Sequence, residues 1–166
     1  MEVSNLAWAR AADDPCWRLF AATLSGEILE LSITQLQPIA STDSSGGAVW
    51  ALRAAPAVPH TSGSSGSGLQ QQLYTAQLAA ACADGSVKLF GVSSGEAGAV
   101  LQRSLPRVEG NALSLAWHPN GRNLVSGGSD GCMHVWDLRT GGWVRGCCGG
   151  GSGSGGCQGR GLSVCL

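Results

Sequence analysis

The chain has 166 residues, enough for one domain, and 43% of them are hydrophobic, so it can bury a core. Charged residues make up only 13% and the formal net charge is −1, so the composition encodes no strongly basic face for nucleic acid. No stretch approaches the roughly 20 apolar residues of a membrane span, and the first residues lack the basic and apolar regions of a secretory signal. We therefore expect an intracellular chain with no membrane partner, whose seven cysteines are reduced.

Three segments repeat one pattern, in which a short apolar strand, a two-residue turn and a second strand follow one another. They span residues 17–31, 78–90 and 124–137. Their turns hold Ser25 and Gly26, Asp84 and Gly85, and Asp130 and Gly131. Glycine accepts the positive φ that such tight turns need, so the pattern predicts three β-hairpins.

Each predicted hairpin lies between two further β-prone stretches. The stretch before it carries a tryptophan: 3–9 with Trp8, 48–52 with Trp50, and 112–117 with Trp117. The stretch after it spans 37–42, 99–105 or 142–146. The sequence therefore predicts three units of four short strands each.

The spacing of the units defines the expected domain organisation. Trp8 and Trp50 lie 42 residues apart, close to the roughly 40–45 of a WD repeat. Trp50 and Trp117 lie 67 apart, and the excess is a Ser-, Gly- and Gln-rich stretch at 56–72, which we interpret as a flexible insertion. We expect WD40 repeats within 1–145, at about 3–44, 46–106 and 110–145, followed by a disordered tail at 146–166 that is rich in Gly, Ser and Cys.

The third unit ends in Val135-Trp136-Asp137, the signature of a WD-type β-propeller blade. In such blades a polar network commonly links a His, a Ser or Thr, the turn Asp and the Trp, because a buried carboxylate needs hydrogen-bond donors. Ser126, Asp130 and Trp136 stand in the matching places, but Glu109-Gly110-Asn111 replaces the expected His.

The networks of the other two units are less complete. Unit two keeps Asp84 but has Ala80 and Phe90 in place of Ser and Trp. Unit one has Ser25 and Leu31 at the corresponding places. Closed propellers have roughly 4–8 blades, so we predict an all-β, partial WD40 propeller of about three blades that does not close. We expect such a chain to be a fragment, a truncated gene product or a part that needs further blades.

At these residues the chain resembles the N-terminal propeller of cirhin-type U3 small-nucleolar-RNA-associated WD proteins of the small-subunit processome. The resemblance covers roughly residues 3–143 and is carried by the order of four stretches: Arg18 to Phe20 with Gly26 to Ile28, Gly46 to Trp50, Cys82 to Phe90, and Leu113 to Pro119. It implies a nucleolar scaffold that joins other WD proteins of the processome and engages the 5′ leader of pre-ribosomal RNA. The insertion and the tail depart from the family.

Four candidate sites have ordinary structural interpretations that we favour. Cys147, Cys148, Cys157 and Cys165 lack the paired spacing of a zinc site. His118 is best explained by the turn at Pro119-Asn120-Gly121. Cys132 and His134 lie two apart on one strand, about 7 Å from each other and too far for nucleophile activation, and His134 is predicted to point outward into solvent. Gly127 and Gly128 lack the pattern of a phosphate loop.

Four arginines and two tryptophans complete the candidates. Arg53, Arg103, Arg107 and Arg122 fall near strand ends, where they would contact RNA phosphate or acidic partners, although ordinary surface charge is the favoured interpretation. Trp17 and Trp143 are assigned to packing between blades rather than to base stacking.

These patterns predict a non-catalytic scaffold with no cofactor, no metal and no small-molecule substrate. The expected partners are other WD40 proteins of the processome, with pre-ribosomal RNA or the U3 small nucleolar ribonucleoprotein, in the nucleus and nucleolus. The alternative is a generic WD40 adaptor of a ubiquitin ligase or chromatin complex.

Overall fold

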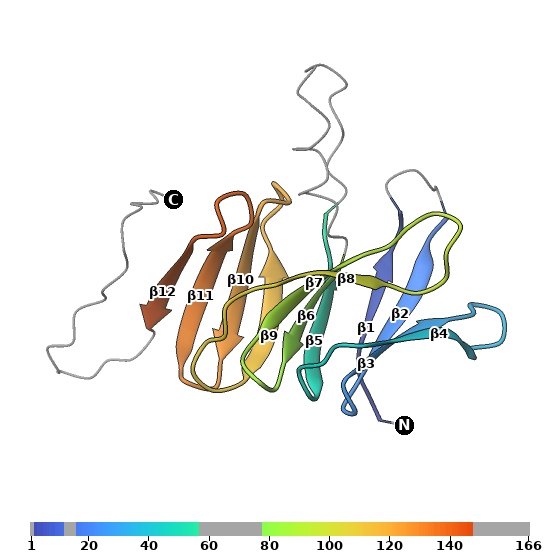
Figure 1. Ribbon diagram of the computed structural model, residues 1–166, viewed down its shortest axis with the longest axis horizontal. Coiled ribbons are helices and arrows are strands. Elements are labelled where there is room, and N and C mark those ends of the chain that lie inside the picture. Colours follow the sequence, from blue (N-terminus) through green and yellow to red (C-terminus); the bar gives the residue numbers. More distant parts are fainter. Residues whose placement is uncertain (1, 12–15, 57–77, 148–166) are drawn as a thin grey trace, which may run out of the picture.

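The computed structural model of the chain describes residues 2–11, 16–56 and 78–147. These residues form twelve strands in three antiparallel four-stranded sheets that lie side by side in chain order (Figure 1). We call the sheets blades one, two and three. The all-β class and the unclosed set of three four-stranded blades are as predicted. The described part of the chain contains no helix long and apolar enough to cross a membrane.

Blade one consists of β1 (Val3–Ala9), β2 (Arg18–Thr23), β3 (Glu27–Leu31) and β4 (Pro38–Asp43). Its β2–β3 turn closes with a bond from the Gly26 N–H to the Thr23 carbonyl at 3.2 Å, and Gly26 has φ +96°. A positive φ is strained for residues with a Cβ, which is why glycine occupies the turn.

Blade two consists of β5 (Val49–Ala54), β6 (Leu78–Cys82), β7 (Val87–Gly91) and β8 (Val100–Ser104). Strands β6 and β7 are buried along their whole length because a blade packs on each of their faces. The predicted insertion at 56–72 falls between β5 and β6, and residues 57–77 lie outside the described part of the chain.

Blade three consists of β9 (Ala112–Trp117), β10 (Asn123–Gly128), β11 (Cys132–Asp137) and β12 (Trp143–Cys147). Burial alternates along β11, so one of its faces is covered and the other is open. Strand β12 extends one residue past the predicted stretch at 142–146, and the rest of the predicted tail lies outside the described residues.

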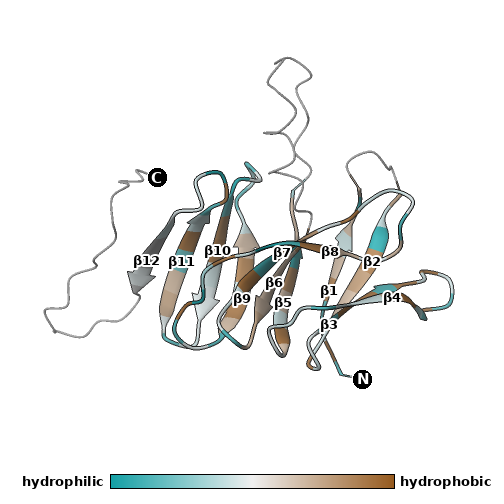
Figure 2. Cartoon of the chain, in the orientation of Figure 1, coloured by the Kyte–Doolittle hydropathy of each residue, from teal (hydrophilic) through white to brown (hydrophobic). Residues whose placement is uncertain are grey.

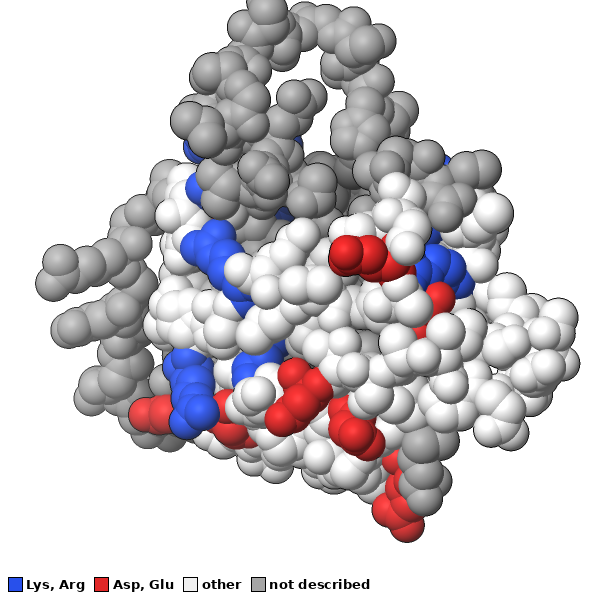
Figure 3. Space-filling model, turned by 45° about the vertical axis from the view of Figure 1, so that its right-hand side comes forward, with Lys and Arg blue, Asp and Glu red and all other residues white. Residues whose placement is uncertain are grey.

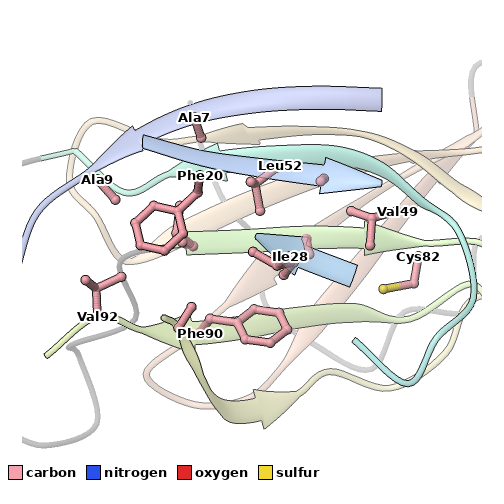
Figure 4. Close-up of a cluster of buried hydrophobic side chains, with 13 residues drawn as sticks. Ala7, Ala9, Phe20, Ile28, Val49, Leu52, Cys82, Phe90 and Val92 are labelled. Carbon is pink, nitrogen blue, oxygen red and sulfur yellow. The ribbon is translucent and has the colours of Figure 1, made fainter. Parts of the chain in front are cut away.

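The core lies between the blades rather than within one of them. The cluster between blades one and two includes Phe20 and Ile28 from one side and Leu52 and Phe90 from the other (Figure 4). The cluster between blades two and three includes Val87 and Leu89 against Leu124 and Trp136. Apolar colour on the strands of the middle blade in Figure 2 agrees with this arrangement. Burial of apolar surface, at about 25 cal/mol per Å², is therefore what joins the blades.

Candidate functional site

The three hairpin turns place equivalent residues of the blades in register. Counting from the turn glycine, Leu31, Phe90 and Trp136 occupy one position, and they pair with Leu19, Leu78 and Leu124 on the neighbouring strand. Because side chains alternate along a strand, these six residues lie on the same face of their respective blades. We call this the first face; in blades two and three it packs on the preceding blade.

Each blade also has a second face, which in blades one and two packs on the following blade. Ile28, Val87 and Met133 share one position on it, and Glu30, Leu89 and Val135 share the next. Ile28 and Val87 are buried in the two inter-blade clusters. The chain therefore contains two complete face-to-face contacts, and the first face of blade one and the second face of blade three remain without a blade in the described residues.

Three of the sequence-selected residues come together in blade three. The indole N–H of Trp136 donates to Ser126 Oγ at 3.0 Å, and both side chains are buried. The Asp130 carboxylate accepts the backbone N–H of Cys132 at 3.0 Å across the turn, where Gly131 has φ +74°. Trp136 also lies against Trp143, with ring centroids 5.7 Å apart. These contacts hold β10, β11 and β12 of blade three together on the face that packs on blade two.

His134 does not point into solvent, contrary to the prediction from its position on the strand. It is 1% exposed and lies on the first face, paired with Ser126, with its Nε2 3.9 Å from Asp130 Oδ2. Its ring lies 5.5 Å from that of Trp143. The prediction was wrong because His134 shares its face of β11 with Cys132 and Trp136, and that face packs on blade two.

The turn of blade two is built on Asp84. Its Oδ1 accepts the Ser86 N–H at 2.9 Å and the Ser86 hydroxyl at 2.6 Å, and its Oδ2 lies 2.7 Å from Arg107. Burial alone would raise the pKa of Asp84, but these hydrogen bonds and the charges of Arg107 and Lys88 outweigh it and lower that pKa. Gly85, at φ +81°, closes the turn through a bond from its N–H to the Cys82 carbonyl.

Blade one has a serine in place of the turn aspartate. Ser25 Oγ lies 2.8 Å from Thr23 Oγ1, which accepts the Glu27 N–H at 2.9 Å. Thr23 is fully buried. In blade one a pair of hydroxyl groups therefore stabilises the turn at Gly26. In the other two turns an aspartate carboxylate accepts the backbone N–H instead.

The three marker tryptophans are not all equivalent. The strand registers align Trp8 with Trp117, because these residues pair with Leu19 and Leu124 respectively, whereas Ala54 pairs with the corresponding Leu78. Trp50 sits in a register shift between Val49 and Ala51. Blades one and three have the same register shift at Ser4 and Leu113, so Trp50 corresponds to these two residues and lies four positions before Ala54, the equivalent of Trp8.

A buried ion pair that the sequence analysis missed joins blades one and two. Arg18 Nε donates to Glu30 Oε1 at 2.7 Å, and the pair is closed by a second, shorter contact. The same guanidinium donates to the carbonyls of Ser93 and Glu96, each at 2.9 Å, and Glu30 accepts the Gly98 N–H. Burial would raise the pKa of Glu30, but the bonds from Arg18 and Gly98 lower it.

The side chains of three of the four predicted surface arginines contact other described residues, and Arg122 bonds to Asn120 and Leu138 through its backbone. Arg53 Nη1 donates to Asn5 Oδ1 at 2.8 Å, Arg103 Nη1 donates to the Leu138 carbonyl at 3.1 Å, and Arg107 pairs with Asp84. On the side drawn in Figure 3, charged side chains lie in scattered groups of mixed sign. These contacts give the three arginines roles in joining strands and blades.

Two further candidates are explained by local geometry. His118 Nδ1 accepts the Asn120 N–H at 3.1 Å, and its carbonyl accepts the Gly121 N–H, so it is a turn residue. Trp17 is exposed, with the Arg10 guanidinium 5.4 Å from its ring centroid, rather than packed between blades. Cys148, Cys157 and Cys165 lie outside the described residues, and the described residues contain no group of three His, Cys, Asp or Glu that could hold a metal ion.

Comparison with known proteins agrees with the geometry. Residues 102–137, which include the β10–β11 hairpin, match the family model "WD domain, G-beta repeat". A solved structure entitled "Humanized mutant of the Chaetomium thermophilum Polycomb Repressive Complex 2 bound to the inhibitor GSK126" aligns with a TM-score of 0.63 at 20% identity, over 82% of this chain and 26% of that chain. At this identity the likeness concerns the fold alone.

The curated relatives are more similar in sequence. The human "U3 small nucleolar RNA-associated protein 4 homolog" is 34% identical over 141 residues, the mouse protein of the same name is 35% identical, and each match covers 82% of this chain and 18% of the relative. The protein from Schizosaccharomyces pombe is 29% identical over 138 residues, 83% of this chain and 17% of the relative. The chain thus spans less than a fifth of the length of these relatives, and over most of its own length it is a WD40 protein similar to U3 small nucleolar RNA-associated protein 4.

Proposed function

We propose that the chain is a non-catalytic WD40 scaffold that acts with the U3 small nucleolar ribonucleoprotein in pre-ribosomal RNA processing. The observation that carries the proposal is the similarity to proteins named for their association with U3 small nucleolar RNA, which extends over all three blades. Its site of action is then the nucleolus. Its partners are other WD40 proteins of the small-subunit processome, with U3 RNA or pre-ribosomal RNA in the same particle.

The geometry supports a scaffold because the polar side chains selected from the sequence form hydrogen bonds that stabilise the turns and strands. We propose that Ser126, Asp130 and Trp136 have a structural role in blade three. We assign the same role to the turn pairs Asp84 with Gly85 and Ser25 with Gly26. We likewise propose that the repeats occupy about 3–44, 46–106 and 110–145. Cys132 and His134 lie on a face that packs on blade two, which would keep a substrate from them.

Affinity purification of the tagged chain from cells tests this function. We expect U3 RNA to be enriched over an unrelated small nuclear RNA, and we expect the chain to co-localise with a nucleolar marker. A variant with Gly85→Ala, which is expected to disrupt the turn of blade two, is the matched control and should lose the enrichment. A soluble, folded chain that recovers ubiquitin-ligase or chromatin proteins without U3 RNA would instead establish the adaptor function.

A further inference from the structure

Three arginines lie around Leu138 at one end of blade three. The N–H of Leu138 donates to the carbonyl of Arg122 at 3.0 Å, and its own carbonyl accepts Arg103 Nη1 at 3.1 Å. Arg139 is the next residue of the chain. The β9–β10 loop, which carries Arg122, and the β11–β12 loop, which carries Arg139, both lie at the upper end of blade three in Figure 1. Arg103 reaches this end from β8 of blade two, and we call the three residues the arginine cluster.

The arginine cluster carries more positive charge than its surroundings neutralise. Arg122 and Arg139 are exposed, and neither forms an ion pair with a carboxylate of the described residues. The acidic residue beside them is Asp137, whose Oδ1 already accepts the N–H of Arg139 at 2.8 Å and that of Thr140 at 3.4 Å. Burial would raise the pKa of Asp137, but these bonds and the charge of Arg139 lower it. Three guanidinium charges against one carboxylate therefore leave a local charge of +2 at neutral pH.

Arg103 is held in place while its guanidinium keeps donors for a ligand. Its Nη1 bonds to the Leu138 carbonyl, and its Nη2 lies beside Gly141, where an added Cβ would be 2.5 Å from it. A guanidinium has five N–H donors, and the bond to Leu138 uses one of them. A side chain that is already ordered loses less conformational entropy when it binds a ligand. Arg103 is therefore the preorganised member of the cluster.

The arginine cluster lies at the end of a blade and not on either of its faces. A further blade packed against blade three would cover a face and leave this end open. The opposite ends of blades two and three carry the turn aspartates Asp84 and Asp130 (Figure 1). The acidic turns and the basic cluster therefore separate charge along the blades, which favours the approach of an anion at the arginine end.

The chemistry of the arginine cluster fits a compact anion with a double charge. The planar guanidinium donates two parallel hydrogen bonds to phosphate oxygens, which a lysine cannot do. A phosphorylated Ser or Thr carries a charge of about −1.5 to −2 at pH 7, which matches the local charge of +2. An RNA backbone spreads its charge along the strand and needs a row of cations. Arg18 and Arg107 do not extend the cluster into such a row, because each is already in an ion pair.

We propose that the arginine cluster binds a phosphorylated Ser or Thr side chain in a segment of a partner protein. Arg103 would donate to the phosphate from its fixed position, and Arg122 and Arg139 would close on it from the two loops. Binding would then depend on phosphorylation of the partner. This inference goes beyond the proposed role in RNA processing and does not depend on it.

Fluorescence anisotropy with the purified full chain tests the phosphate site. The probe is a labelled degenerate peptide mixture with one fixed central phosphoserine, and its twin has serine at the same place. Arg122→Gln and Arg139→Gln are each expected to weaken binding of the phosphorylated mixture about tenfold, because each removes hydrogen bonds to a charged group. Arg10→Gln makes the same change of charge at an exposed position of blade one and should stay within about twofold of the wild type. Circular dichroism of every variant establishes that the β structure is retained.

Two further measurements separate a phosphate site from general attraction of anions. Arg122→Lys keeps the charge but loses the paired donors, so it is expected to recover only part of the affinity that Arg122→Gln loses. A short oligouridylate, added at the concentration of the peptide, is expected to leave the phosphopeptide bound. Equal binding of the serine twin, or an equal loss of affinity in Arg10→Gln, would overturn the proposal. Displacement by the oligouridylate would overturn it as well, because the cluster would then be an RNA contact.

Discussion

Lys88 and His134 occupy the same position in successive blades, and each is the fourth residue after the aspartate of its hairpin turn. Lys88, which is buried, donates to the Ser44 carbonyl, and His134 lies 3.9 Å from Asp130. Blades two and three therefore each bury a basic side chain near an acidic turn, in a face that packs on the preceding blade. Leu29 occupies the position in blade one.

Acid is expected to destabilise the fold through Asp84. The pKa of Asp84 in the folded chain lies below the ordinary value of 3.8. As the pH falls, this carboxylate is therefore protonated in the unfolded chain before it is protonated in the folded chain. The ionised Asp84 side chain therefore contributes its full stabilisation at a pH above its unfolded pKa. This stabilisation is lost as the pH falls through the lowered pKa of the folded chain. Melting temperatures measured between pH 7 and pH 3 should fall less steeply in Asp84→Asn than in the wild type. Equal slopes for the two proteins would refute this role of Asp84.

The turn glycines are expected to differ in their tolerance of a side chain. A Cβ at Gly85 would lie 2.4 Å from the carbonyl oxygens of Val108 and Gly110, whereas one at Gly131 would meet nothing within 4 Å. Both have a positive φ, which costs a residue with a Cβ about 1–2 kcal/mol. Gly131→Ala should therefore lose about that amount of stability in denaturant titrations, and Gly85→Ala clearly more. The reverse order would contradict the packing of this turn.

The Trp136–Ser126 hydrogen bond is expected to contribute to stability because both groups are buried. Ser126→Ala leaves the indole N–H without this acceptor, at a cost of about 1–3 kcal/mol. Trp136→Phe, which removes the donor and some packing, should make the additional loss from Ser126→Ala small. A double-mutant cycle by chemical denaturation measures this coupling. Additive losses would mean that the bond does not form.

Removing Arg18 is expected to loosen blade one from blade two. Arg18→Ala leaves the buried Glu30 carboxylate without its partner and breaks the bonds to Ser93 and Glu96, and breaking such a pair costs about 3–5 kcal/mol. Arg139→Ala at an exposed position serves as the control and should stay within about 0.5 kcal/mol of the wild type. Amide exchange measured along β1 to β3 should accelerate selectively in Arg18→Ala. Uniform exchange rates in the two variants would oppose this assignment.

The parts of the fold encoded locally could be predicted from the sequence. The turns at Gly26, Gly85 and Gly131 follow from residue types that tolerate a positive φ, and the strands around them follow from apolar alternation. The pairing of β9 to β12 into one sheet follows from the same repeat, and so does the matching order in the other two sheets.

The features that depend on strand register or on contacts between distant residues could not be predicted from the sequence. Trp50 lies 42 residues after Trp8, but its alignment with Ser4 instead of Trp8 becomes visible only when β5 pairs with β6. The burial of His134 cannot be predicted from the sequence, because alternation shows that two faces differ without showing which of them meets another blade. Glu30 finds its Gly98 partner 68 residues away, and no local pattern indicates such a contact.

The most direct test of the stacked blades is a nuclear Overhauser measurement on the isotope-labelled full chain. We predict cross-peaks from the Trp117 indole N–H to Arg53, and from the Phe20 ring to the methyl groups of Leu52, since these contacts join different sheets. Intact strand signals within each sheet, without any cross-peak between sheets, would contradict the account.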